Sequence, residues 1–173
     1  MAYSPLNWYA IYTKSNFEKK IYKKLIETSI ETYLPLRTHL KQWSDRKKKV
    51  EEPLIRSYLF VRITEKEYQN VLRVPGVVKF ISFSDRPITI PDYQIDVMKK
   101  LLADGTDVEV SSEHFAPGDP VEIVAGKLMG LTGELIESKG NKKVIIRIDQ
   151  LDRSLLINIS SGFIKKRELL EVN

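Results

Sequence analysis

The sequence contains no cysteine, and no apolar run reaches the roughly 18 residues that a membrane-spanning helix requires. The absence of thiols excludes disulfides, thiol nucleophiles and cysteine-ligated zinc, and it fits a reducing compartment. The first residues, MAYSPLNWY, do not show the charged and then apolar order of a signal peptide. We therefore expect a cytoplasmic protein that does not bind membranes.

Residues that commonly carry catalysis are also scarce. The two histidines, His39 and His114, have no partner in a metal-binding or catalytic motif. The stretch GKLMGLTG is a poor phosphate cradle, because it leads into a predicted strand and not into a helix. The sequence therefore predicts no enzyme activity, no metal and no cofactor.

Basic residues are concentrated in one part of the chain. The net charge is +5, but residues 14–62 hold 13 Lys or Arg against 6 Asp or Glu, so the remainder is slightly acidic. A basic segment of this kind indicates contact with a polyanion such as nucleic acid. The alternative, a solvated basic surface without a partner, stays open.

Residues 1–102 have the pattern of a domain that mixes helices and strands. Ser15 and Glu18, and later Thr64 and Glu67, are spaced as capping boxes that predict the starts of two helices. Together with four strand-like segments they give the order strand, helix, strand, strand, helix, strand, which predicts a split βαβ fold of the ferredoxin or RRM type. The four predicted strands cover residues 8–13, 33–41, 54–63 and 77–83. The polar tract SDRKKK, residues 44–49, predicts that the second and third strands form a long hairpin with a basic tip.

Two of these strands carry aromatic residues at alternate positions. Trp8 and Tyr12 share one face of the first strand, and Tyr58 and Phe60 share one face of the third, because side chains alternate across a pleated strand. If the strands are neighbours, these rings form one surface, and an open aromatic surface indicates a bound partner. The alternative is that the rings are ordinary core beneath the amphipathic segment 91–102.

The C-terminal part of the chain has a different texture. Residues 103–117 are polar and acidic and lose the periodicity, which predicts a linker. Short β-branched runs then follow, and so many short strands in so little chain predict a small SH3-like β-barrel over residues 118–173. The five predicted strands cover residues 121–124, 131–137, 142–149, 154–159 and 163–166, with a turn at Gly140 and Asn141 between the second and third.

Four segments, in order along nearly the whole chain, resemble the bacterial NusG-type transcription elongation factors. The stretches WYAIYTK, EEPLIRSYLFV and VPGVVKFISF match the family's N-terminal NGN domain, and GDPVEIVAGKLMGLTGELIE matches its KOW element. Within the family the chain looks most like the specialised antiterminators of the RfaH and UpxY type. The resemblance implies a transcription antitermination factor that suppresses pausing and termination, and the UpxY likeness implies surface-polysaccharide operons as its setting.

The resemblance also implies site residues. The family's open aromatic face binds the clamp helices of the RNA polymerase β′ subunit, and the matching positions are Tyr12, Tyr58, Phe60 and Phe80. The outward direction of Phe80 is ambiguous, because VVKFISF is apolar on both faces.

Contacts with DNA and with further proteins are implied in the same way. Positions matching family contacts to the non-template DNA strand are Lys14, Lys20 and Lys24, with Arg73 close by. A contact with the polymerase β subunit would fall around residues 67–69, where the sequence departs from the family's pattern. In the KOW element, Gly126 and Leu128 match the region that binds ribosomal protein uS10 or Rho. For Leu128 the alternative is that it plugs the end of the barrel, and whether this barrel can refold into helices stays open.

A plain RNA-binding module is the main rival interpretation. RSYLFVRI, residues 56–63, is similar to the RNP1 pattern of an RRM, in which aromatic rings stack on bases, although it lacks the internal glycine. In either interpretation we expect a monomer.

Overall fold

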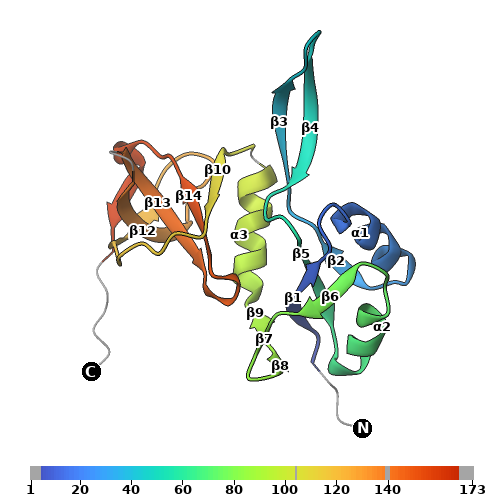
Figure 1. The fold of residues 1–173 in the computed structure, drawn as a ribbon. Helices are drawn as coiled ribbons and strands as arrows, with labels where there is room; N and C mark the ends of the chain where they lie inside the picture. The colour runs from blue at the N-terminus through green and yellow to red at the C-terminus, as the bar shows by residue number, and fades with distance from the viewer. Residues whose placement is uncertain (1–4, 104, 139–140, 168–173) are drawn as a thin grey trace, which may run out of the picture. The chain divides into compact units, whose positions relative to one another are not determined.

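The computed structural model describes residues 5–103, 105–138 and 141–167, and it divides into two compact units, Met1–Met98 and Lys99–Asn173 (Figure 1). None of the helices in the described ranges is long and apolar enough to cross a membrane. The division falls near the predicted end of the first domain at residue 102.

The first unit is built on an antiparallel sheet with the strand order β2-β5-β1-β6, and β9 also pairs with β1. Helices α1 and α2 provide the crossovers, so this is the predicted split βαβ arrangement. Helix α3 begins in this unit and runs past its end. The elements are β1 (Asn7–Thr13), α1 (Glu18–Glu27), β2 (Glu31–Tyr33), β3 (Leu36–Gln42), β4 (Lys47–Pro53), β5 (Tyr58–Ile63), the 3-10 turn η1 (Glu65–Glu67), α2 (Tyr68–Leu72), β6 (Val77–Phe80), β7 (Ser82–Phe83), β8 (Arg86–Pro87), β9 (Thr89–Ile90) and α3 (Asp92–Ala103).

The core of this unit lies between the sheet and the two crossover helices. Tyr9 and Ile11 of β1 point to this side and pack with Ile21 and Leu25 of α1 and Val71 of α2. The buried positions of α1 are four residues apart, so they lie on one side of the helix, as the periodicity of the sequence predicted. The alternate residues of β1, including Tyr12, are therefore left to the opposite face of the sheet.

The two predicted capping boxes have different outcomes. The box of Thr64 and Glu67 is confirmed: a Glu67 carboxylate oxygen accepts hydrogen bonds of 2.8 Å from the Thr64 backbone N–H and from its hydroxyl. The box of Ser15 and Glu18 was wrong, because α1 begins at Glu18 with no side-chain cap. Glu18 is buried, and its carboxylate bonds a residue far away in the sequence, as described below.

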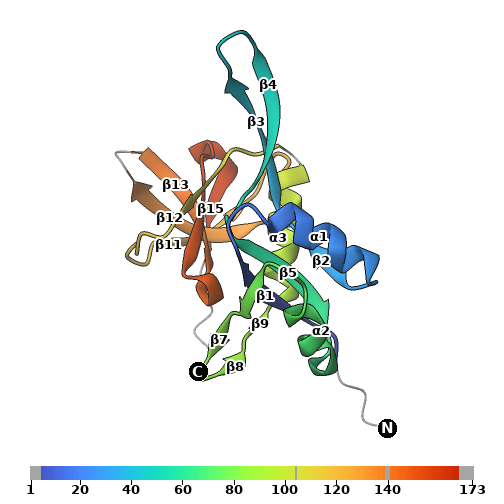
Figure 2. The same ribbon diagram turned by 45° about the vertical axis from the view of Figure 1, so that its right-hand side comes forward.

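Strands β3 and β4 form a two-stranded sheet of their own, which projects from the first unit (Figure 2). Its base is tied to α1, because the Lys19 ammonium donates a 2.8 Å hydrogen bond to the Glu51 carbonyl. The predicted hairpin is therefore present, but its strands differ from the prediction: β3 pairs with β4, the tip is shortened to residues 43–46, and Lys47–Lys49 of the predicted tip belong to β4. The polar side chains of β4 hid this strand from the sequence pattern.

The second unit contains one antiparallel sheet of six strands in the order β10-β14-β13-β12-β11-β15. Among the described residues the pairings form an open path without closure into a barrel. Gly140, in the predicted turn, lies outside the described residues. The elements are β10 (Val108–Ser111), β11 (Asp119–Ile123), β12 (Thr132–Ser138), β13 (Asn141–Ile148), the 3-10 turn η2 (Asp149–Leu151), β14 (Arg153–Ile157), the 3-10 turn η3 (Ser161–Phe163) and β15 (Ile164–Lys166).

Strand β10 lies inside the segment 103–117 that the sequence predicted to be a linker. It pairs with β14 from Val108 opposite Ile157 to Ser111 opposite Ser154, and Val108 is buried. Sequence patterning missed this strand because only two of its four residues are apolar, and acidic and serine residues surround them.

An ion pair between Arg147 of β13 and Glu134 of β12 lies beside Gly118, the residue that precedes β11. Arg147 donates two hydrogen bonds to Glu134, of 2.8 Å from Nε and 3.0 Å from Nη2, and the Gly118 N–H donates a third of 2.9 Å. A Cβ on Gly118 would lie 2.3 Å from the Leu135 carbonyl oxygen, so only glycine allows this close approach. These bonds, with that of Arg147 foremost, hold the pKa of Glu134 below its ordinary value of 4.5.

We expect this pair to make the stability of the protein depend on pH. Because the pKa of Glu134 is lowered in the folded protein, its contribution is complete above about pH 4.5 and is lost as the pH falls through the folded pKa. Glu134→Gln should therefore lower the melting temperature at pH 7, and the difference from the wild type should shrink at pH 3. Circular dichroism melts of both proteins at the two pH values measure this, and a difference independent of pH would contradict it.

Candidate functional site

The face of the first sheet that α1 and α2 leave uncovered carries a row of three side chains from three strands. The register places Tyr12 of β1 opposite Tyr58 of β5 on one side and opposite Lys79 of β6 on the other. The two tyrosine rings meet edge to face with centroids 5.5 Å apart. Tyr12 is 38% exposed and Lys79 is exposed, so this row is an aromatic surface with a cation beside it.

The same face becomes more buried away from Tyr12. In the next row Phe60 is opposite Ala10 and Tyr33, and Phe60 is fully buried with its ring 6.3 Å from that of Tyr33. Trp8, further along, is also buried. The part of α3 within this unit lies on this side of the sheet (Figure 1). Each of the two interpretations of the aromatic residues therefore holds for part of the set. Phe60 and Trp8 belong to the core, whereas Tyr12 reaches the surface.

Tyr58 is held in place by a bond from the helical side of the sheet. The buried Glu18 carboxylate accepts a 2.8 Å hydrogen bond from the backbone N–H of Ser57. Ser57 has φ of 64°, and its carbonyl accepts a 2.9 Å bond from the Thr13 N–H. Ser57, which precedes Tyr58, and Thr13, which follows Tyr12, are thus both fixed by hydrogen bonds. These bonds set the positions of the two rings.

Phe80 does not join this surface, and its predicted place was wrong. Its register partner is Ile11, so it faces the helices, where it is buried against the rings of Tyr9 and Tyr68 at centroid distances of 6.1 and 4.9 Å. The register shifts between Tyr12 and Thr13, and Lys79 takes the place opposite Tyr12. The sequence missed Lys79 and Tyr33 as members of this face, because neither belongs to the aromatic pairs of β1 and β5.

The predicted DNA-contacting residues are all exposed and lie around α1 and its neighbouring loop. Lys20 and Lys24 share one side of α1; the Lys20 ammonium lies 5.6 Å from the ring centre of Phe17, and Lys24 pairs with Glu27 at 3.3 Å. Lys14, whose backbone N–H bonds the Gly76 carbonyl at 2.9 Å, follows β1, and Arg73 ends α2. These four cations therefore all lie on the surface of the first unit, around α1 and the loops beside it.

Gly76 allows a close approach between the loop after α2 and the residues before α1. Its φ is 101°, and an added Cβ would lie 2.7 Å from a ring carbon of Phe17. The loop after α2 therefore lies against the start of α1.

Residues 67–69, the matching site for a β-subunit contact, have internal roles. Glu67 caps Thr64, and Tyr68 packs on Tyr9 with centroids 5.1 Å apart. Burial raises the pKa of the Tyr68 hydroxyl. Only Gln69 of the three is left as an exposed polar side chain.

In the second unit the loop between β11 and β12 agrees with the alternative for Leu128 and not with an exposed, partner-binding Leu128. Gly126 takes φ of 78°, as a turn requires, but Leu128 is buried and Met129 is the exposed apolar residue, at 61%. Gly126 and Leu128 line a pocket of about 210 Å³ together with Phe163. Leu128 therefore fills this end of the sheet, and Met129 and Phe163 are the side chains open to a partner.

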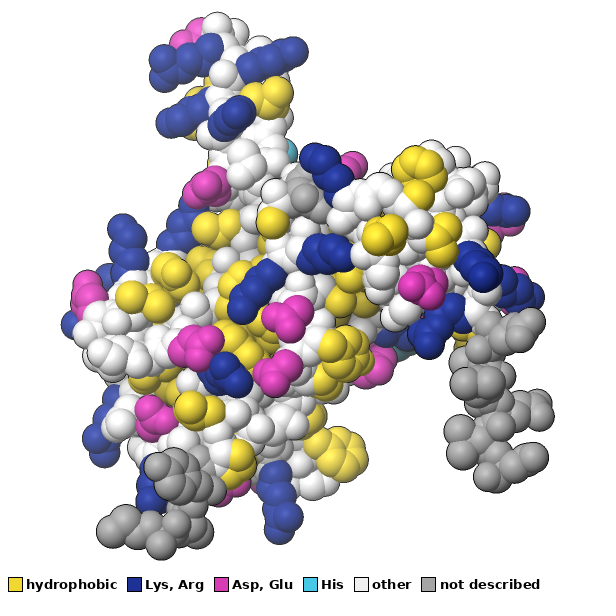
Figure 3. Space-filling model, turned by 180° about the vertical axis from the view of Figure 1, so that it is seen from behind, with side chains coloured by type: hydrophobic (Ala, Val, Ile, Leu, Met, Phe, Trp, Pro, Cys, Tyr) yellow, Lys and Arg dark blue, Asp and Glu magenta, His cyan; other side chains and the backbone are white. Residues whose placement is uncertain are grey.

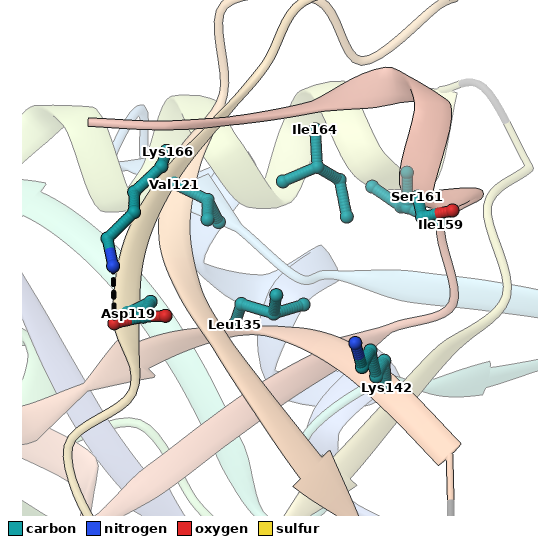
Figure 4. Close-up of a pocket in the computed structure, with 8 residues that line it drawn as sticks. All are labelled: Asp119, Val121, Leu135, Lys142, Ile159, Ser161, Ile164 and Lys166. Atoms are coloured by element: carbon teal, nitrogen blue, oxygen red, sulfur yellow. Dashed lines mark ion pairs between the residues drawn. The ribbon is translucent and has the colours of Figure 1, made fainter.

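A larger pocket of about 400 Å³ opens elsewhere in the second unit (Figure 4). Half of its lining residues are apolar and half are polar or charged, and among the charged ones Lys166 pairs with Asp119 at 3.2 Å. The lining residues are Asp119, Val121, Leu135, Lys142, Ile159, Ser161, Ile164 and Lys166. In the described ranges no group of three or more His, Cys, Asp or Glu residues could hold a metal ion.

Comparison with known proteins places this architecture in a family. The family model described as "Transcription termination factor nusG" matches residues 6–99, more than half of the 173-residue chain. The chain is 26% identical over 148 residues to the transcription termination/antitermination protein NusG of Streptococcus pyogenes serotype M1, covering 78% of this chain and 82% of that protein. It is 25% identical over 150 residues to the NusG protein of Pseudomonas aeruginosa, covering 80% and 85%.

A solved structure agrees in fold. The structure titled "Domain interaction in Thermotoga maritima NusG" covers 94% of this chain and 98% of its own, with a TM-score of 0.55 and 24% identity. This likeness concerns the fold alone, whereas the family model covers nearly all of the first unit and its aromatic face. The chain belongs to the NusG family.

Proposed function

We propose that this protein is a non-enzymatic transcription antitermination and elongation factor that binds the clamp helices of the RNA polymerase β′ subunit. The observation that carries the proposal is the contact pair of exposed Tyr12 and half-buried Tyr58, held in place on a sheet face that no crossover helix covers. By binding elongating polymerase better than its paused or termination-prone states, the protein would suppress pausing and termination.

The chemistry of this surface suits a helical partner. Aromatic rings supply large, rigid contact area, and their hydroxyls can still bond at the edge of an interface. The Lys79 ammonium beside them would favour a partner with acidic side chains at the rim of its apolar ridge. Phe60, in the next row of the same face, is fully buried and is not itself a contact.

The setting of this activity follows from the resemblance to RfaH and UpxY. We place the protein among these specialised antiterminators, acting on long surface-polysaccharide operons. Its partners would be RNA polymerase, through β′ and Gln69 at the β subunit, and the non-template DNA strand, with the protein itself a cytoplasmic monomer.

The non-template strand would run along the exposed cations of the first unit. Phosphate contact requires mobile cations on one side, which Lys20 and Lys24 provide on α1, with Lys14 and Arg73 at the neighbouring loops.

Charge reversal tests this contact. Lys20→Glu with Lys24→Glu should abolish crosslinking of the protein to the non-template strand of a transcription complex, because both phosphate contacts become repulsive. Crosslinking from a photoreactive base in that strand measures the effect. Lys66→Glu with Lys142→Glu makes the same change of charge at exposed sites elsewhere and is the control. Undiminished crosslinking of the α1 variant would contradict the DNA contact.

The second unit would recruit a further protein. Met129 and Phe163, exposed beside the pocket that Gly126 and Leu128 line, support a protein partner, either ribosomal protein uS10 or Rho. Purified uS10 and Rho can be tested separately for binding to the full chain and to Met129→Ser, and loss of one interaction in the variant identifies the partner.

The decisive experiment measures readthrough of a terminator in a purified transcription system with and without the protein. Increased readthrough, together with association with purified β′, supports the function. If the protein instead bound short single-stranded RNA without polymerase and left termination unchanged, the RRM-like function would replace it.

A further inference from the structure

The pocket of about 400 Å³ in the second unit lies on one face of the six-stranded sheet. Val121 of β11 is opposite Lys166 of β15 in the register. Two residues earlier, Asp119 of the same strand is opposite Leu135 of β12. Because residues two apart on a strand share a face, these side chains enclose one space. The segment between β14 and β15, which carries Ile159, forms a further wall (Figure 4).

The apolar residues of this pocket are recessed from the surface. Val121 is buried, and three more are half-buried, namely Leu135, Ile159 and Ile164. By contrast Met129, at the end of the unit proposed to bind a protein, is 61% exposed. On the right of Figure 3, apolar side chains of this unit reach the surface among Lys and Arg side chains. A folded partner contacts exposed side chains of that kind, whereas a recessed lining suits a small ligand, whose pockets span about 300–1,000 Å³.

One cation of the pocket has no carboxylate partner. Lys166 is neutralised by Asp119 at 3.2 Å. Lys142 of β13 is exposed on the other side of the aliphatic side chains (Figure 4). Within the described ranges Lys142 forms no ion pair, even with Glu137, its partner in the register. An anionic group bound on this side would therefore gain an ion pair without breaking one.

We propose that this pocket binds a small aliphatic monocarboxylate, whose hydrocarbon chain lies against the recessed apolar residues and whose carboxylate meets Lys142. Burial of the chain supplies affinity, and the ammonium selects the charge of the head group. An aliphatic amine would be repelled by the same cation, and an uncharged alcohol would leave it without a partner. The pocket contains none of the residues proposed to contact polymerase, DNA or a protein partner, so this inference goes beyond the proposed function.

The test titrates the full chain with sodium butanoate, hexanoate and octanoate and follows the backbone amides by nuclear magnetic resonance. The amides of Leu135 and Ile164, on two walls of the pocket, should shift. The affinity should rise about fourfold for each methylene that is buried, and therefore about 16-fold from one acid to the next.

Variants at Lys142 test the head group. Lys142→Gln should weaken octanoate binding about two- to fivefold, the range of an exposed ion pair, and Lys142→Arg should retain it. Lys165→Gln is the matched control, because Lys165 is an exposed cation of β15 that does not line the pocket. Octanol, which has the same chain without the charge, should bind the wild type and Lys142→Gln equally.

Several results would overturn the proposal. These are an absence of shifts at the pocket, an affinity that does not depend on chain length, and octanoate binding by Lys142→Gln as strong as that by Lys165→Gln. Shifts confined to Gly126 and Met129 would place the ligand at the smaller pocket and overturn it as well. The titration contains neither polymerase nor nucleic acid, so its failure and failure of the proposed function give different results.

Discussion

Replacing Tyr12 and Tyr58 together by alanine is expected to weaken association with the polymerase β′ subunit by about 30-fold or more, because truncating a central aromatic pair at an interface costs about 2 kcal/mol or more in total. The rings contact each other and lie on the exposed part of the sheet face, so their removal takes away the centre of the proposed surface. Binding to purified β′ clamp helices, measured by calorimetry, gives the loss directly, and terminator readthrough should fall with it.

Phe83→Ala is the matched control for this experiment. Phe83 ends β7 and is 77% exposed, so its removal also takes an aromatic ring from the surface of the first unit. It belongs to neither the tyrosine pair nor its neighbouring rows, and binding to β′ should remain as in the wild type. If the double tyrosine variant bound as well as Phe83→Ala does, the polymerase-binding face would have to lie elsewhere.

Phe80→Ala is expected to lower the free energy of unfolding of the first unit by about 3–5 kcal/mol, the usual cost of truncating a buried phenylalanine. The ring packs against Tyr9 and Tyr68 in the core of the first unit. Its removal therefore leaves a cavity inside the core. Both tryptophans of the chain, Trp8 and Trp43, belong to the first unit. Tryptophan fluorescence during urea unfolding therefore reports this unit alone.

Tyr12→Ala is the control for this experiment, because it truncates an aromatic ring on the opposite face of the same sheet. Tyr12 is partly exposed, so its truncation should cost about 1 kcal/mol or less, within the range of changes at surface sites. A small effect of Phe80→Ala, with a large effect of Tyr12→Ala, would mean that the two faces of the sheet had been exchanged. The pair thus tests the register between β1 and β6 independently of any partner.

Local patterns in the sequence predicted much of this architecture. Alternation in WYAIYT and YLFVRI placed the aromatic residues of β1 and β5 on common faces, because strand periodicity is a property of the backbone alone. The stripe of Ile21 and Leu25 predicted the buried side of α1, and the Thr64 and Glu67 spacing predicted a cap within one turn. Membership of the NusG-type family followed from motifs of the same kind and was confirmed by the family model over residues 6–99.

Interactions between distant segments could not be predicted in this way. The shift of register between Tyr12 and Thr13 decides that Lys79 joins Tyr12 and that Phe80 faces the helices, and no local pattern in VVKF specifies it. Glu18 is spaced to cap its own helix but bonds Ser57, 39 residues away, because a buried carboxylate needs donors and the folded chain supplies this one. Strand β10 forms because β14 offers an edge to pair with, which four residues cannot reveal by themselves.

The amino-acid sequence by itself determined the strand and helix faces, the basic hairpin and the family, since these depend on residues close together in the chain. The tertiary structure decided which aromatic side chains reach solvent. Exposure depends on strand register and on what packs above each ring, and both are set by segments far apart in the sequence.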